Sequence, residues 1–149
     1  MSVEILSAPF DPGAVYSRFL AQGDGSGAGV VFTGIVRSTA AAPIRALVLE
    51  CYPDLAKNEI AAIRMQAVER FDLLGAAILH RYGRLLPGEP IMQVMTLAAH
   101  RQAAFDGAQF LMDYLKTDAP FWKKEETAVG ETWVEPRASD DAARGRWKR

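Results

Sequence analysis

Residues 114–126, with the sequence YLKTDAPFWKKEE, bring three lysines, a proline and three aromatic side chains together in a short stretch. Lys116 lies in the last turn of a predicted helix, where the helix dipole favours a cation. Because Pro120 cannot continue that helix, we expect the chain to turn there and bring Lys123 back toward Lys116. Two converging amines would stabilise an anionic intermediate. The alternative is that these lysines are solvated surface residues, as most lysines are.

A second candidate site combines three cationic side chains at the ends of apolar segments. His100 and Arg101, in AAHRQAAF, stand where a predicted strand meets a predicted helix, and the free N–H groups of a helix N-terminus favour an anion such as phosphate. Arg37 ends the apolar segment VVFTGIVR just before a loop, a common place for a ligand-binding residue. The alternative is that His100 only caps the helix and that Arg101 is solvated.

The composition predicts one soluble globular domain. Of the 149 residues, 50% are hydrophobic and 23% are charged, and the mean hydropathy is close to zero. A chain of this kind can bury a substantial core. The net charge of -1 provides no overall positive field of the kind that binds nucleic acid. An RNA-binding domain that stacks bases on Phe121 and Trp122 is therefore disfavoured, and no RNP-type motif supports it.

Neither a membrane segment nor a metal site is predicted. No apolar run approaches the roughly 18 to 20 residues of a membrane span, and Met1–Phe10 lacks the features of a signal peptide, so we expect a cytoplasmic protein. Cys51 is the single cysteine, which excludes an intramolecular disulfide, and we expect it to be buried in a strand. His80 and His100 have no clustered carboxylates, so we predict no metal and no cofactor.

The hydrophobic pattern predicts an α+β domain. Strands are expected at residues 3–6, 30–37, 44–52, 76–83 and 91–100, and helices at 12–21, 55–71 and 101–116. A hairpin is expected at 121–135, with its turn at Val129 and Gly130. The glycine-rich residues 22–29 precede a strand and match neither a dinucleotide-binding nor a Walker loop. This order favours a mixed or antiparallel sheet with helices on one side, in a single domain at 1–137, followed by a polar, flexible tail at 138–149.

Six segments that span most of the chain carry a resemblance to a known family. In order along residues 30–137 they are FTGIVR, LECYP, HRYGRLLPGE, AHRQAAF, FLMDYLKTDAPFWKKE and WVEPR. Together they resemble the catalytic large subunit of molybdopterin synthase. The resemblance implies an α/β-hammerhead-like fold and a sulfurtransferase of molybdenum cofactor biosynthesis. Such an enzyme converts cyclic pyranopterin monophosphate to molybdopterin with two dithiolene sulfurs from the thiocarboxylated C-terminus of a small ubiquitin-like sulfur-carrier subunit.

The resemblance also implies roles for individual residues. Lys116, in YLK, and Lys123, after PFW, match lysines that the family uses in catalysis and in substrate binding. Further substrate-binding roles are implied for charged residues of the matched segments: Arg37, His100, Arg101, Lys124, Glu125 and Arg137. Relatives form a homodimer at the centre of a heterotetramer with two small subunits, and the same assembly is expected here. The alternative function is a non-catalytic module that binds a partner's C-terminal tail and a phosphorylated ligand.

Overall fold

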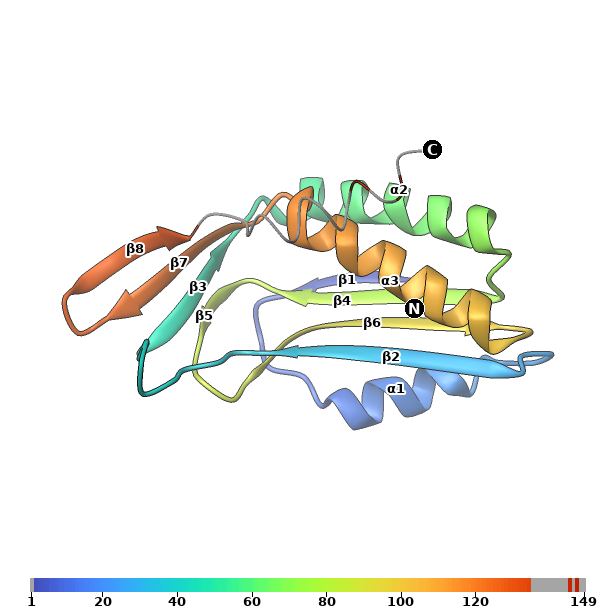
Figure 1. Ribbon diagram of the computed structural model, residues 1–149, viewed down its shortest axis with the longest axis horizontal. Helices are drawn as coiled ribbons and strands as arrows, with labels where there is room; N and C mark the ends of the chain where they lie inside the picture. The colour runs from blue at the N-terminus through green and yellow to red at the C-terminus, as the bar shows by residue number, and fades with distance from the viewer. Residues whose placement is uncertain (1, 135–144, 146, 148–149) are drawn as a thin grey trace.

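The computed structural model describes residues 2–134, 145 and 147 (Figure 1). Its elements, in chain order, are β1 (Val3–Leu6), α1 (Pro12–Leu20), β2 (Ala28–Ile35), β3 (Ala46–Glu50), α2 (Pro53–Phe71), β4 (Gly75–Arg81), β5 (Gly83–Leu85), β6 (Pro90–Ala98), α3 (Arg101–Thr117), β7 (Trp122–Thr127) and β8 (Gly130–Val134). Every predicted strand and helix is present with slightly different ends, and the short β5 is additional. None of the helices in this described part is long and apolar enough to cross a membrane.

The strands form two sheets, which lie side by side in Figure 1. The first has the order β1-β4-β6-β2 and is mixed, because β1 runs parallel to β4 while the other neighbours are antiparallel. The second has the order β5-β3-β7-β8 and is antiparallel. The predicted α+β class and the hairpin are confirmed. The chain builds two sheets, however, rather than the single sheet expected.

Helices cover both faces of the first sheet (Figure 1), so the prediction that they lie on one side was wrong. On one face, α2 and α3 share a core with Ala76 and Ile78 of β4. On the other face, α1 packs through Phe19 against Ala77 and Leu79. The physical reason is that successive strand residues point to opposite faces, and β4 is buried on both, so each face needs a cover.

α3 determines where the residues that follow it lie. It packs on α2 and on β6, and its buried stripe includes Ala104, Ala108 and Leu111, as the helical spacing predicts. At Gly107, a Cβ atom would lie 2.8 Å from the Cδ1 atom of Leu73. Glycine at this position therefore lets α3 approach the segment between α2 and β4 closely.

Candidate active site

Lys116 and Lys123 flank the short segment that joins α3 to β7. Lys116 lies in the last turn of α3, which ends at Thr117, and Lys123 is the second residue of β7. Between them the chain turns, and the N–H of Phe121 donates to the carbonyl oxygen two residues earlier at 2.8 Å. The helix thus ends before Pro120, which is consistent with the restriction that a proline imposes on the preceding residues.

His80, the penultimate residue of β4, lies beneath this segment. Its side chain is buried, with the residue 8% exposed, and its ring stacks on that of Phe121 with the ring centroids 3.9 Å apart. Its Nδ1 atom lies 2.9 Å from the carbonyl oxygen of Arg81. Because a carbonyl oxygen only accepts hydrogen bonds, Nδ1 carries the proton in this arrangement, and Nε2 is left with a lone pair.

The imidazole of His80 is uncharged at neutral pH. The pKa of His80 is lowered to about 4, and burial is the largest cause. The positive charges of Lys116 and Lys123 contribute to the lowering, and the hydrogen bond with the Arg81 carbonyl opposes it. Both lysines therefore act electrostatically on one buried ring. Both lysines thus lie within electrostatic range of His80, and cations in such a region can stabilise a negatively charged intermediate.

His80 was not among the predicted site residues, because its place in the sequence indicates at most a metal ligand. The spacing of His80 could have indicated its burial. It follows Ala76 and Ile78 at alternate positions of an apolar strand, so the three side chains point to the same face of the sheet. A histidine on a buried face needs a hydrogen-bond partner, and such residues are candidates for functional sites. Which residues surround it could be learned only from the tertiary structure.

Arg37 lies two residues beyond the end of β2 and is exposed. The neighbouring Val36 fixes this segment, because its N–H donates to the Glu89 carbonyl at 3.0 Å and its carbonyl accepts from the N–H of Gly88 at 2.8 Å. Arg37 is thus held where β6 begins and β4 ends. α3 follows the opposite end of β6 and runs back along the sheet (Figure 1), so Arg37 and Lys116 are at the same end of it.

His100 and Arg101 lie at the other end of α3. His100 occupies the N-cap position, but its side chain makes no capping hydrogen bond, and both side chains are exposed. With a rise of about 1.5 Å per residue, Arg101 and Lys116 are roughly 23 Å apart along the helix. A single chain therefore does not bring this pair together with the two lysines.

The remaining predicted residues differ in their surroundings. Lys124 points to the opposite face of β7 from Lys123, where its Nζ atom pairs with Glu50 at 2.9 Å and lies 4.4 Å from the ring centroid of Trp133. The hydrogen bond with Glu50 raises the pKa of Lys124. Glu125 alternates back to the face of Lys123. Arg137 lies outside the described residues.

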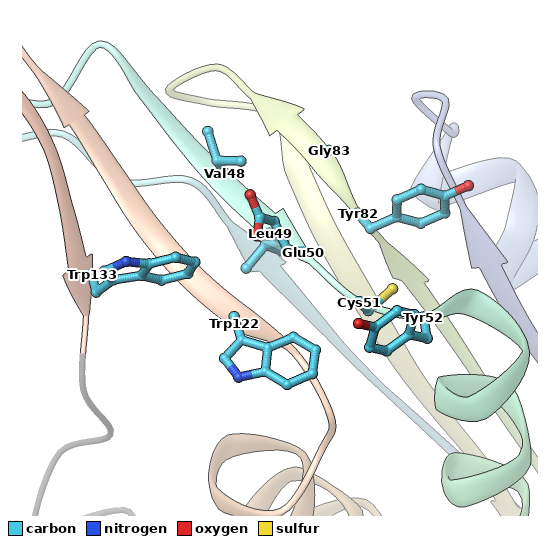
Figure 2. A pocket seen from close by; sticks show the side chains of 9 residues that line it. All are labelled: Val48, Leu49, Glu50, Cys51, Tyr52, Tyr82, Gly83, Trp122 and Trp133. Atoms are coloured by element: carbon cyan, nitrogen blue, oxygen red, sulfur yellow. The ribbon is translucent and has the colours of Figure 1, made fainter.

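An open aromatic groove of about 710 Å³ lies on the second sheet (Figure 2). Trp122 and Trp133 line it from the hairpin, and Tyr52 and Cys51 from the segment after β3. Cys51 is therefore half-buried in a groove, and its predicted burial within a strand was wrong, because β3 ends one residue earlier. Partial burial raises the pKa of the Cys51 thiol. In the described part of the chain, no three His, Cys, Asp or Glu side chains gather as metal ligands would.

Known proteins match both the sequence and the fold. The family model described as MoaE protein matches residues 5–118. The molybdopterin synthase catalytic subunit of Cereibacter sphaeroides is 50% identical over 99% of this chain and 100% of its own length, and that of Pseudomonas aeruginosa is 49% identical over 99% of each.

Solved structures agree with these matches. The MoaE protein of Burkholderia ambifaria superposes with a TM-score of 0.84 and 42% identity, over 99% of this chain and 98% of that one. Molybdopterin synthase from Staphylococcus aureus gives a TM-score of 0.80 and 28% identity, over 89% and 96% of the two chains. The two sheets and the lysine-flanked turn described above are thus those of a chain that belongs to the MoaE family.

Proposed function

We propose that this chain is the catalytic subunit of a molybdopterin synthase, a sulfurtransferase of molybdenum cofactor biosynthesis that acts in the cytoplasm. Its substrate is cyclic pyranopterin monophosphate, and the two dithiolene sulfurs come from the thiocarboxylated C-terminus of a small ubiquitin-like sulfur-carrier subunit. The observation that carries the proposal is that Lys116 and Lys123 both lie within electrostatic range of the uncharged ring of His80, in a chain that matches the MoaE family model over residues 5–118.

The two lysines suit the transfer of sulfur from an acyl group. When the thiocarboxylate sulfur has bonded to the pterin, water must attack the carrier's carbonyl carbon so that the acyl carbon–sulfur bond breaks and the sulfur stays on the pterin. That attack passes through an anionic tetrahedral state, which positioned cations stabilise. Lys116 and Lys123 are the proposed catalytic residues, as cations or as proton carriers. The buried His80 is uncharged at neutral pH, so it does not repel the ammonium groups of the two lysines.

The phosphate group of the pterin is an anion, so we expect further cationic side chains to bind it. Arg37, at the lysine end of the sheet, is proposed to bind substrate in the same chain. His100 and Arg101 are roughly 23 Å along α3 from Lys116, so we propose that they act on the site of a second copy in the homodimer. Their exposed side chains and the free N–H groups of the helix N-terminus support anion binding there.

Three further residues are proposed to make smaller contributions to substrate binding. Glu125 shares the face of Lys123 on β7 and lies near the site. Lys124 is engaged by Glu50 and Trp133, so its contribution to substrate binding is expected to be smaller. Arg137 is retained from the family resemblance alone. The enzyme is proposed to occupy residues 1–137, with residues 138–149 as a tail.

Mass spectrometry of the pterin tests the proposed function directly. The purified chain is mixed with thiocarboxylated carrier and cyclic pyranopterin monophosphate, and the expected product carries two additional sulfurs. Carrier with a plain carboxylate is the control and should yield none. A chain that binds both carrier and pterin but forms no product would be a binding module, and the proposal would be wrong.

Hybrid dimers test the assignment of His100 and Arg101 to a second copy. Lys116→Ala and Arg101→Ala chains, each weakly active alone, are mixed and allowed to exchange subunits. If the residues act across the dimer, one of the two sites in each hybrid contains an intact Lys116 and an intact Arg101, so activity returns. If they act within one chain, every site has a defect and mixing restores nothing.

A further inference from the structure

An aromatic cluster between α2 and α3 holds Trp147, a residue of the polar tail. The indole ring meets Phe71 and Phe110 edge to face, with ring centroids 5.7 and 5.6 Å apart and interplanar angles of 84° and 78°. Such contacts contribute beyond the apolar area that they bury. Trp147 is thereby part of the main core, although it stands among polar and charged residues in the sequence.

Arg70 ties Trp147 to the end of α2. Its guanidinium carbon lies 5.4 Å from the centroid of the indole ring and 5.6 Å from the centroids of Phe71 and Phe110. Its Nη1 atom also donates a hydrogen bond of 3.0 Å to the carbonyl oxygen of Trp147. The same side chain thus contacts both the ring and the backbone of Trp147, which fixes the residue in one orientation.

Asp113 ties Trp147 to the end of α3. The indole Nε1–H donates to Oδ2 of Asp113, and the amide of Gln109 donates to Oδ1 at 2.8 Å. Asp113 is only 5% exposed, so these donors compensate a carboxylate that has little access to water. Its backbone carbonyl accepts from the hydroxyl of Thr117 at 2.9 Å, which connects it to the last residue of the helix.

We infer that Trp147 is a positioning residue for Lys116, which it reaches through Asp113 and the last turns of α3. Asp113 and Lys116 are three residues apart, so they are neighbours on successive turns, and a rotation of the helix end that moves one moves the other. Asp113 lies on the buried side and Lys116 on the exposed side. The inference rests on the proposed function, because it assumes that the position of Lys116 matters for sulfur transfer.

Hydrogen exchange tests, without any catalytic turnover, whether Trp147 holds the last turns of α3 in place. In Trp147→Phe, an aromatic ring remains but the indole donor is lost, and amides of residues 114–117 should exchange faster by on the order of tenfold, the factor that corresponds to one hydrogen bond to a charged group. The amides in the first turn of α3 should not change. Trp133→Phe makes the same substitution at an exposed position of β8 and should leave the end of α3 unchanged.

Kinetics then decide between positioning and stability alone. Trp147→Phe should lower kcat on the order of tenfold and leave the KM values for carrier and pterin unchanged. A misplacement of 1 Å costs roughly hundredfold in rate, and the expected shift of Lys116 is smaller than that. Wild-type kcat in this variant, or a lower kcat without faster exchange at residues 114–117, would overturn the inference. If the unmodified chain makes no molybdopterin, the proposed function is wrong. Unchanged hydrogen exchange in Trp147→Phe would separately refute the positioning role of Trp147.

Discussion

The imidazole of His80 stacks on the phenyl ring of Phe121, with ring centroids 3.9 Å apart and planes inclined by 16°. This contact joins β4 of the first sheet to the turn that separates Lys116 from Lys123. It therefore fixes how the two lysines lie relative to the sheet. An imidazolium at the same place would repel the ammonium groups of the two lysines, and burial prevents this by keeping His80 neutral.

The free energy of unfolding should fall as the pH drops from about 6.5 to about 4, because of His80. Its pKa is about 4 in the folded chain and 6.5 in the unfolded chain, so the unfolded chain takes up the proton first. The resulting loss is on the order of 3 kcal/mol and is absent above pH 6.5. Urea unfolding at pH 7 and pH 4.5 measures this difference in the free energy of unfolding.

Two histidine variants serve as test and control. His80→Gln should lack this part of the pH dependence, and His100→Gln, at an exposed position, should keep it. Equal pH dependence in wild type and His80→Gln would contradict the prediction.

Lys116→Ala should nearly abolish molybdopterin formation while the chain stays folded. A positioned proton carrier typically contributes about 10²- to 10⁴-fold, and the exposed side chain of Lys116 makes no large contribution to the core. The rate of product formation is measured by mass spectrometry, and circular dichroism checks the fold. Lys57→Ala, at an exposed position of α2, is the control and should retain activity. Wild-type turnover by folded Lys116→Ala would exclude this lysine from catalysis.

Lys123→Ala should also be severely impaired, and Lys123→Arg should recover only part of the activity. Arginine keeps the positive charge, but it cannot release a proton near neutral pH and is a poor nucleophile. The comparison of the two variants therefore separates electrostatic stabilisation from proton transfer or attack by an amine. Full activity of Lys123→Arg, measured at saturating carrier and pterin, would leave charge as the whole contribution of Lys123.

Cys51→Ser should retain sulfur transfer. Partial burial raises the pKa of the Cys51 thiol, which keeps it protonated at neutral pH, and the thiol is a much weaker nucleophile than the thiolate. The sulfur should instead come entirely from the carrier's thiocarboxylate. Product is measured with thiocarboxylated and with plain carboxylated carrier for both chains. Loss of activity in a folded Cys51→Ser variant that still binds the carrier would move the sulfur chemistry onto this chain.

Local signals in the sequence predicted most of the elements. Asp11 and Pro12 mark the start of α1, and the side chain of Asp11 accepts hydrogen bonds from the N–H groups of Gly13 and Ala14 as an N-cap residue does. The turn around Val129 and the positive φ of Gly130 close the predicted hairpin. Such features depend on a few neighbouring residues, so they can be predicted without knowledge of the tertiary structure.

Features that depend on distant residues could not be predicted in this way. β5 has only three residues and exists because β3 offers it a neighbour to pair with. The role of His80 depends on lysines more than 30 positions away, and the position of Trp147 depends on Phe71 and Asp113. Arg101 begins the helix that ends near Lys116 and His100 is its N-cap residue, but that rigid helix is also what separates this pair from Lys116.

The order of the strands in the first sheet has a consequence for how the chain folds as it is synthesised. β1 can pair only when β4 exists, because Val3 to Leu6 align with Ile78 to Arg81, and β2 can pair only with β6, whose last residue is Ala98. Both early strands therefore have unpaired backbone N–H and C=O groups until their partners have been synthesised, and pairing over such sequence distances is slow. Synthesis reaches Lys116 and Lys123 only after the last of these partners is complete, so every strand of the first sheet is made before either lysine.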